Sequence, residues 1–439
     1  MNSQNISATL RCIETECRTS FSIDQRLYVC PACGGLLDVD YDLRSLENPN
    51  ESKAVFKQRR TSDAACDLSG VWRFRELLPF VTDISSIVSL VEGNTPIYEA
   101  PRSANYANLE SLRFKHQGLN PTGSFKDNGM TTAITHARML GAGAVACAST
   151  GNTSASMAAY AARAGMRGFV FVPAGQVAHA KLSQSIEYGA LVVEIEGNFD
   201  DAMRIVRELS LVADVYLLNS LNPFRLEGQK TIIVEMMEQL GWESPDWIVL
   251  PGGNLGNTSA FGKALYELHV LGLIARMPRL AVIQAEGAAP FYDLFKSEAS
   301  TLTPVAEPRT LATAIRIGSP VSWKKAVRAL DWTRGIVATV TEQEIADAKA
   351  IIGVDGIGCE PASAATLAGL KRLVASGMVE ATDSVVAVLT GNLMKDSGYT
   401  VDYHSGRLTL ADGKIESTYA NSSIRVPADQ SEIRRILEL

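Results

Sequence analysis

The strongest constraint on the fold is a regular alternation of short apolar runs with helical patterns, which begins at about Met130. Helical patterns occupy about 131–140, 154–164, 180–188 and 200–212, and apolar runs lie at 144–148, 168–172, 191–195 and 215–218. A second series has apolar runs at 247–251, 280–284 and 384–389 and a helical pattern at 259–271. Such alternation is typical of parallel sheets with helices on both faces. The sequence therefore predicts an α/β fold with two open sheets.

Size and charge narrow the class of protein. A chain of 439 residues, of which 46% are hydrophobic, is long enough for two or three domains with substantial cores. The net charge of −7 argues against a body that binds nucleic acid or an anionic membrane surface. No apolar run reaches transmembrane length, and residues 1–5 lack the basic and apolar parts of a signal peptide. We expect a cytoplasmic enzyme with no nucleic-acid or membrane partner.

Two cysteine pairs stand near the start of the chain: Cys12 with Cys17, and Cys30 with Cys33. Paired thiolates can complete a tetrahedral zinc site, so the segment resembles a zinc ribbon, and a plain β-hairpin is the alternative. Four cysteine ligands would leave no open position for catalysis, so a bound metal would be structural. Acidic side chains surround the pairs, whereas a nucleic-acid module would carry basic ones.

The stretch 120–127, with the sequence NPTGSFKD, places a lysine directly before a helical pattern. Pro121 fixes one backbone angle, and Gly123 can adopt conformations that other residues cannot. Such a loop can hold the amine of Lys126 at a fixed point. A lysine that is held and desolvated can lose its proton near neutral pH and act as a nucleophile or form a Schiff base. An ordinary surface lysine after a turn is the alternative.

Two polar turns follow predicted strands, where open parallel sheets bind their ligands. The turn 149–154, STGNTS, has hydroxyl and amide side chains that suit an anion at a helix N-terminus. The turn 251–258, PGGNLGNT, has glycines that let backbone N–H groups close around a phosphate. It has neither the P-loop ending nor the dinucleotide spacing, so the phosphate is expected to belong to a ligand other than ATP or NAD.

Two further residues are candidates for ligand binding. Arg225 follows a strand end and a Pro turn, near Asn219 and Ser220, and an arginine among amides and hydroxyls can bind an anion. The alternative is a capped helix start in which Arg225 pairs with Glu227 or another carboxylate. Thr390 follows the last predicted strand and can present its hydroxyl to the same site, although a plain turn residue is the alternative.

Taken in this order, the motifs closely resemble those of the threonine synthases, which are fold-type II enzymes dependent on pyridoxal phosphate (PLP). The resemblance runs from about residue 91 to 404 and includes AIRIGSPV at 314–321 and VDYH at 401–404. It is closer to the plant-like branch of the family than to the longer fungal-type branch. It implies a tryptophan synthase β-like fold: two open, mostly parallel α/β domains with an N-terminal cysteine-rich ribbon-like segment. The implied parts are a ribbon-like segment (1–45), a helical linker (46–90), a large PLP-binding domain (91–129 and 246–400), a small domain (130–245) and a C-terminal extension (401–439).

The resemblance also implies roles for single residues. Lys126 would carry the PLP Schiff base, Asn152 would hydrogen-bond the PLP 3′-oxygen, and Thr390 would face the pyridine nitrogen. The residues that would hold the PLP phosphate are Gly252, Gly253, Asn254, Leu255, Gly256 and Asn257. The residues that would bind the carboxylate and phosphate of the substrate are Ser149, Thr150, Thr153, Asn219, Ser220 and Arg225.

The implied reaction converts O-phospho-L-homoserine and water into L-threonine and phosphate. The implied assembly is a homodimer. Lys126 would be the base, and PLP would be the electron sink. Two alternatives are open: a related PLP-dependent β-replacement or dehydratase enzyme, such as one similar to cysteate synthase, and a non-catalytic threonine synthase-like protein. One departure concerns residues 392–395, NLMK, where many relatives have His-Gly-Leu-Lys, so no role of that histidine is carried over.

Overall fold

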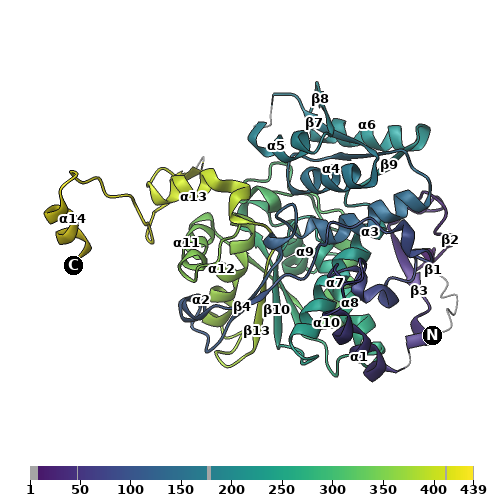
Figure 1. Cartoon of the computed structure of the whole chain (residues 1–439), viewed down its shortest axis with the longest axis horizontal. Coiled ribbons are helices and arrows are strands. Elements are labelled where there is room, and N and C mark those ends of the chain that lie inside the picture. The colour runs from purple at the N-terminus through teal and green to yellow at the C-terminus, as the bar shows by residue number, and fades with distance from the viewer. Residues whose placement is uncertain (1–7, 47, 176–178, 411–412, 439) are drawn as a thin grey trace.

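Two separate sheets organise the chain, as seen in the computed structural model of Figure 1, which describes residues 8–46, 48–175, 179–410 and 413–438. The larger sheet has the order β12-β11-β10-β13-β5-β4, and only its edge pair β4 and β5 is antiparallel. Its strands are β4 (Ile97–Glu99), β5 (Arg113–His116), β10 (Trp247–Pro251), β11 (Arg279–Ala285), β12 (Ile336–Val340) and β13 (Val385–Leu389). With its helices it forms what we call the large lobe.

The smaller sheet has the order β8-β7-β6-β9 and is parallel throughout. Its strands are β6 (Ala144–Ala148), β7 (Arg167–Pro173), β8 (Leu191–Ile195) and β9 (Val215–Leu217). The helices α4 (Asn152–Ala164), α5 (His179–Glu187) and α6 (Phe199–Val212) pack against it and form the small lobe, at the top of Figure 1.

The remaining helices follow the same alternation with strands. They are α1 (Pro49–Arg59), α2 (Pro101–Tyr106), α3 (Lys126–Met139), α7 (Pro223–Gln239), α8 (Gly256–Val270), α9 (Pro290–Ser297), α10 (Trp323–Thr333), α11 (Glu342–Val354), α12 (Pro361–Ala375), α13 (Ser397–His404) and α14 (Gln430–Leu437). Short 3-10 turns lie at Leu43–Leu46, Trp72–Leu77, Ile84–Ser86, Gln117–Leu119, Glu286–Ala288, Thr313–Ile315 and Leu393–Asp396. Among the residues that the structure describes, no helix has the length and apolar character needed to cross a membrane.

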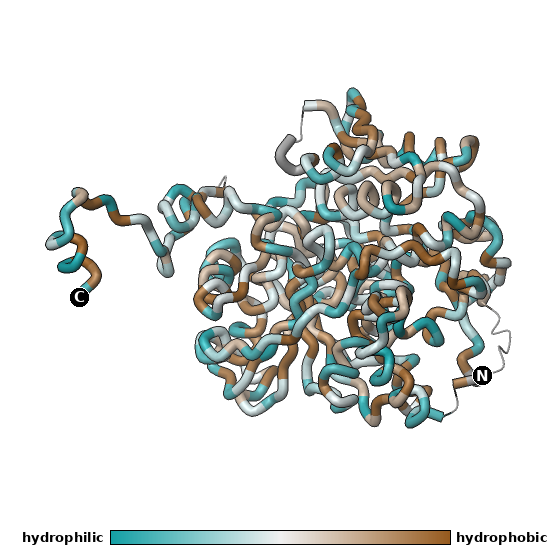
Figure 2. The backbone as a smooth tube through the Cα atoms, viewed as in Figure 1, coloured by the Kyte–Doolittle hydropathy of each residue, from teal (hydrophilic) through white to brown (hydrophobic). Residues whose placement is uncertain are grey.

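The central strands show why these segments fold as they do. Every residue of β6, β10 and β13 is buried, because helices cover both faces of the two sheets. Strands buried on both faces are continuous apolar runs rather than alternating ones, which is the pattern that the sequence shows. Figure 2 shows these hydrophobic stretches threading the interior of both lobes.

Helices α3 and α7 cross at the junction of the lobes with their backbones in contact. A Cβ atom at Gly228 would lie 1.8 Å from the backbone oxygen of Asn128 and 2.5 Å from the hydroxyl of Thr132. Only glycine fits there. The contact fixes α3, whose first residue is Lys126, against α7, which carries Arg225.

The cysteine-rich segment forms a three-stranded antiparallel sheet with the order β2-β1-β3, which we call the ribbon (residues 8–41). Its strands are β1 (Ala8–Cys12), β2 (Ser20–Ser22) and β3 (Leu37–Tyr41). The ribbon lies beside both lobes at the right of Figure 1.

The predicted α/β class with two parallel sheets is confirmed, and the strands at 144–148, 191–195 and 247–251 have the predicted limits. The stretch 89–97 reads in the sequence as an entry strand with a turn, and this prediction is wrong, because only Ile97–Glu99 pairs with a neighbouring strand. The segment before it bonds to side chains instead: Leu90 donates its N–H to Glu92, and Val91 donates to Ser89.

The C-terminal residues divide into a packed part and a projecting part. Helix α13 buries Tyr399 and Tyr403, and the short strands β14 (Thr409–Leu410) and β15 (Gly413–Lys414) form a hairpin after it. Beyond them the chain extends from the body to α14, which contains no buried residue (Figure 1). The C-terminal extension therefore packs through α13, whereas α14 has no buried residue.

The Gly228 contact gives a test of the helix crossing. Gly228→Ala is expected to lower the free energy of unfolding by about 1–3 kcal/mol or more, because overpacking separates α3 from α7. Gly353→Ala is the matched control, since Gly353 lies in α11 and a Cβ atom there would meet no other atom within 4 Å. The control should be neutral or stabilising by up to about 1 kcal/mol in a urea titration. Equal effects of both substitutions would contradict the crossing.

Candidate active site

The stretch 120–127, which we call the lysine loop, is hydrogen-bonded to the residues at the end of β13. The N–H of Phe125 donates to the carbonyl of Thr390 at 3.0 Å, and the N–H of Asn392 donates to the carbonyl of Gly123 at 2.9 Å. Gly123 has a φ of +83°, a conformation that favours glycine. These bonds bring together two predicted site regions, the lysine loop and the turn after the last strand.

Lys126 begins α3 and has an unusual charge environment. Burial and, to a smaller extent, the positive charge of Arg225 lower the pKa of Lys126 to about 7, against an opposing effect of Glu360. The Nζ atom lies 4.1 Å from the ring centre of Phe125. An amine with this pKa is substantially uncharged at neutral pH and can act as a nucleophile or a base.

A buried carboxyl group joins two residues that the resemblance assigned to the PLP ring. Asn152 Nδ2 donates to Glu360 at 2.9 Å, and Thr390 Oγ1 lies 3.0 Å from the other carboxyl oxygen of Glu360. Burial raises the pKa of Glu360. A Cβ atom at Gly391 would lie 2.3 Å from the carboxyl carbon, so this carboxyl fits only against glycine.

Glu360 is a functional candidate that the sequence did not reveal. It caps the N-terminus of α12 directly before Pro361, in a segment with no preceding strand. Glu before a helix-starting proline is a common helix signal, so the residue type carried no functional information. The glycine after Thr390 could have indicated a close neighbour, although not which residue it is.

The turn between β10 and α8 has the form of a phosphate site. Leu255 has a φ of +61° and directs the chain into α8, which begins at Gly256. The side-chain oxygens of Asn257 and Thr258 are buried without a hydrogen-bond partner. The hydroxyl of Thr258 can donate to an anion beside the first N–H groups of the helix, whereas the side-chain oxygen of Asn257 can only accept a hydrogen bond. The turn therefore fits the phosphate of PLP.

Arg225 is a buried cation near Lys126. Its guanidinium donates to the carbonyl of Leu218 at 3.0 Å, whereas its Nε has no partner. Burial lowers the pKa of Arg225 to about 10. The alternative pairing with Glu227 is wrong, because that carboxylate instead pairs with Lys230 at 2.8 Å and with Lys263 at 2.5 Å. Within the described part of the chain, no ion pair is found for Arg225.

The other predicted substrate residues lie at the ends of β6 and β9. Asn219 uses both amide atoms on Ala148, accepting from its N–H at 3.0 Å and donating to its carbonyl at 2.9 Å. Its side chain therefore joins two strand ends. Ser149, Thr150 and Thr153 are half-buried at the start of α4, and Ser220 is half-buried after β9.

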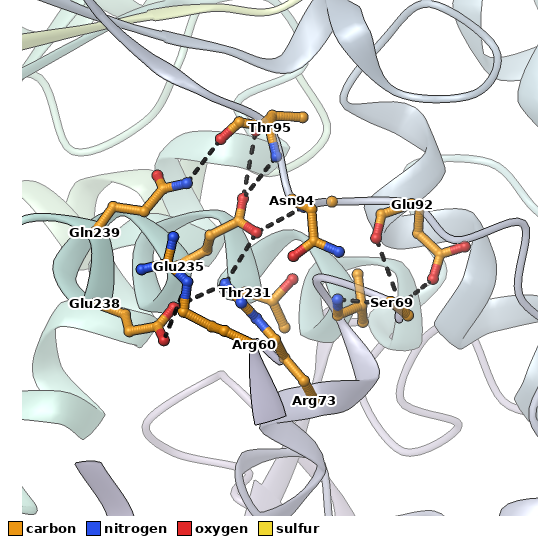
Figure 3. Close-up of polar contacts among 12 residues, drawn as sticks. Arg60, Ser69, Arg73, Glu92, Asn94, Thr95, Thr231, Glu235, Glu238 and Gln239 are labelled. Carbon is orange, nitrogen blue, oxygen red and sulfur yellow. Dashed lines mark hydrogen bonds and ion pairs between the residues drawn. The ribbon is translucent and has the colours of Figure 1, made fainter. Parts of the chain in front are cut away.

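A buried ion network is centred on Glu235, next to Asn94 and Thr95 (Figure 3). The carboxylate of Glu235, on α7, accepts from Lys115 at 2.6 Å, from Arg73 at 3.2 Å and from the N–H of Asn94 at 2.6 Å. The neighbouring N–H of Gly93 donates to Asn120 Oδ1 at 2.8 Å. The network thus fixes the segment that holds the first residue of the lysine loop.

The four cysteines of the ribbon converge at one point, away from the lysine. The sulfur atoms of Cys12, Cys17, Cys30 and Cys33 all lie within 4.8 Å of one another. The predicted pairs therefore come together in a set that could hold a metal ion.

The pKa of Lys126 gives a test on the protein freed of small molecules. Labelling of this amine by cyanate, followed by peptide mass spectrometry from pH 5 to 11, should show a midpoint near pH 7, because only the uncharged amine reacts. Arg225→Ala should move the midpoint upward, since it removes a charge that disfavours the protonated amine. An unshifted midpoint near that of ordinary lysines, about 10.4, would contradict the described environment.

Comparisons with known proteins identify the family of the chain. A family described as "Pyridoxal-phosphate dependent enzyme" matches residues 88–391. The threonine synthase of Methanocaldococcus jannaschii is 41% identical over 98% of this chain and 99% of its own, and that of Methanosarcina acetivorans is 45% identical over 93% and 97%. The solved threonine synthase of Escherichia coli shares the fold, with a TM-score of 0.67 at 16% identity over 98% of this chain and 99% of that one. The chain belongs to the threonine synthases, a family of PLP-dependent enzymes.

Proposed function

We propose that this threonine synthase acts on O-phospho-L-homoserine and water, and that the residues gathered around Lys126 carry the reaction to L-threonine and phosphate. The observation that carries the proposal is the environment of Arg225. Its guanidinium is buried, its Nε has no hydrogen-bond partner, and it lies near Lys126, whose pKa is about 7. A guanidinium binds phosphate strongly through paired hydrogen bonds. A phosphorylated substrate would supply the missing partner.

The residues present fit PLP. Lys126 would hold the cofactor, Asn152 and Thr390 would contact its ring, and the N–H groups of residues 252–257, at the start of α8, would bind its phosphate. When bound, PLP supplies an electron sink that stabilises negative charge on a substrate carbon. The fit rests on the unpartnered hydroxyl of Thr258, which lies near the start of α8, and on the depressed pKa of Lys126.

Lys126 would move the protons of the reaction. With a pKa of about 7 it can accept a proton from Cα of the substrate and release it again without a large change in free energy. A proton then leaves Cβ, the Cγ–O bond breaks, and phosphate leaves with the electron pair. Water adds its hydroxyl at Cβ, Cγ gains one proton and becomes a methyl group, and Cα regains its proton. Arg225 would hold the phosphate through bond breaking.

Glu360 would position the ring contacts rather than react. Its pKa is raised by burial, so the carboxyl group is neutral over a wider pH range than an exposed glutamate. It orients Asn152 and Thr390 from one side, while Ser363 accepts from the N–H of Thr390 at 2.8 Å. These bonds fix both side chains before any ligand binds.

Exchange at Glu360 tests that positioning role. Glu360→Gln retains the shape and one acceptor, so the affinity for PLP should stay within about tenfold of the parent. Glu360→Ala leaves Asn152 and Thr390 without this partner, at about 1–3 kcal/mol for each group, and should weaken PLP by more than tenfold. Titration of the visible absorbance of bound PLP gives both affinities. Equal affinities in the alanine and glutamine variants would contradict the role.

The substrate is tested by phosphate release. The PLP-loaded enzyme should release phosphate from O-phospho-L-homoserine and form threonine, with little turnover of O-phospho-L-serine. Preference for O-phosphoserine would favour the rival β-replacement activity. Arg225→Ala should raise KM for the phosphorylated substrate by about tenfold to a hundredfold while PLP affinity is kept, because a charged hydrogen bond contributes about 1.5–3 kcal/mol. Equal loss of PLP would contradict the substrate role of Arg225.

The assembly and location are further parts of the proposal. We assign the large domain to residues 91–129 with 246–400 and the small domain to 130–245. The projecting α14 exposes Ile433 and Leu437, which a second copy in a homodimer can cover. All seven cysteines are free thiols, which supports a reducing compartment such as the cytoplasm.

A further inference from the structure

The ribbon contacts both lobes, although it belongs to neither sheet. We propose that Zn²⁺ binds the thiolates of Cys12, Cys17, Cys30 and Cys33, and that the zinc-bound ribbon is a strap that joins the two lobes and steadies the turn at Asn254. The part of this proposal that concerns PLP rests on the proposed function. The metal site and the strap stand on the contacts of the ribbon itself.

The geometry of the four sulfurs matches zinc. A tetrahedral Zn²⁺ with Zn–S bonds of about 2.3 Å needs its sulfurs about 3.8 Å apart. The distances are 3.4 Å between Cys12 and Cys33 and 3.7 Å between Cys17 and Cys30. Thiolate ligands alone, in a closed set of four, favour zinc over the harder divalent ions.

The backbone around the second pair is built for this convergence. The N–H of Gly34 donates to the carbonyl of Cys30 at 2.8 Å, and the N–H of Cys30 donates to the carbonyl of Gly35 at 2.7 Å. A Cβ atom at Gly35 would lie 3.2 Å from the sulfur of Cys12 and 2.5 Å from the side chain of Glu14. The turn therefore presses its backbone against the sulfur site.

One end of the strap is attached to the small lobe. Arg26 forms an ion pair of 2.8 Å with Asp214, directly before β9. The hydroxyl of Tyr28 accepts from the N–H of Leu217, in β9, at 2.7 Å. Because β9 is an edge strand, Tyr28 satisfies a backbone donor that no neighbouring strand can reach.

The other end is attached to the large lobe through α10. Asp38, in β3, pairs with Lys325 at 2.8 Å and with Arg328 at 2.6 Å. Glu14, between the first two cysteines, pairs with Lys324 at 2.8 Å. Charged contacts attach the ribbon at both ends. The ribbon therefore links the two lobes mechanically.

The large-lobe attachment of the ribbon includes residues 321–324, and this segment also contacts the turn proposed to bind the PLP phosphate. A pocket of about 440 Å³ separates the ribbon from residues 321–324 and is lined by Cys17, Cys33 and Lys324, among others, which gives a metal ion a path to the site. The N–H of Ser322 donates to the carbonyl of Asn254 at 3.2 Å. One segment thus connects the sulfur site with the turn.

The ribbon needs a cross-link because its strands are short. Five, three and five residues form β1, β2 and β3, and a sheet of this size cannot hold its loops by packing alone. Cys12 ends β1, and Cys17, Cys30 and Cys33 lie in the connecting loops 13–19 and 23–36. Zinc binding would fix both loops, since the free energy of metal binding contributes directly to folding.

The experiment compares the full-length PLP-loaded enzyme with two variants. Wild type and Cys66→Ser, whose cysteine lies outside the cluster, should contain about one zinc per chain by elemental mass spectrometry. Cys30→Ser/Cys33→Ser should lack it. In that variant, amide exchange at 214–217 and at 321–324 should rise about tenfold or more. The dissociation constant of PLP should rise about tenfold, while saturating PLP restores the visible absorbance.

A second variant tests the strap without touching the metal. Arg26→Ala/Tyr28→Phe should retain zinc and increase exchange at 214–217 alone, because only the small-lobe attachment is weakened. Iron or no metal in the wild type would overturn the site. Zinc with unchanged exchange at 214–217 in this variant would overturn the strap, even where the cysteine variant does not fold. Absence of PLP absorbance in the wild type would instead contradict the proposed function, leaving the zinc and exchange results to decide this inference.

Discussion

The carboxylate of Glu235 is the interaction on which the arrangement of the active site depends. It lies on α7, is 1% exposed, and binds Arg73 from the N-terminal linker, Lys115 from β5 and the backbone before the lysine loop. Glu238 adds a second pairing to Arg73 at 2.8 Å, so the buried charges balance. Burying ions is expensive and becomes tolerable only when every partner is in place. The network therefore accepts a single register of linker, strand and helix, which is the register that brings Arg225 and Lys126 together.

The active site, unlike this balanced network, has an excess of positively charged groups. Arg225 is a buried cation, Lys126 becomes cationic below a pKa of about 7, and the nearby carboxyl group of Glu360 is held toward its neutral form. The imbalance costs stability without a ligand, and anionic groups relieve it. A protein that keeps such a region must support it with rigid surroundings, and the contact of Gly228 with α3 and the Glu235 network supply that support.

Much of the fold and of the candidate site could be predicted from the sequence, because the patterns that indicate the strands, the helices and the principal motifs are each contained in a short stretch of the chain. Apolar runs and helical patterns indicated the parallel sheets, and the family, fold class and cofactor expected from the motif order are confirmed. The roles of single residues stay predictions. Glu360 could not be found, since its meaning comes from Asn152, which is 208 positions away. Asn219 was expected to contact the substrate, yet its amide joins two strand ends, a geometry that sequence spacing does not reveal. The segment 89–96 was expected to form a strand, and its N–H groups instead donate to side chains such as those of Glu92 and Glu235.

The position of the ribbon has a consequence for how the chain folds. It precedes both lobes in the sequence, and Arg26 contacts a residue 188 positions later, while Glu14 contacts one 310 positions later. Contacts of such high sequence separation form late, and long chains of this kind pass through intermediates. On the ribosome the ribbon emerges before either of its docking surfaces exists. Its strands stay undocked until α10 is complete, so the ribbon is made before both lobes and is among the last segments to reach its native place.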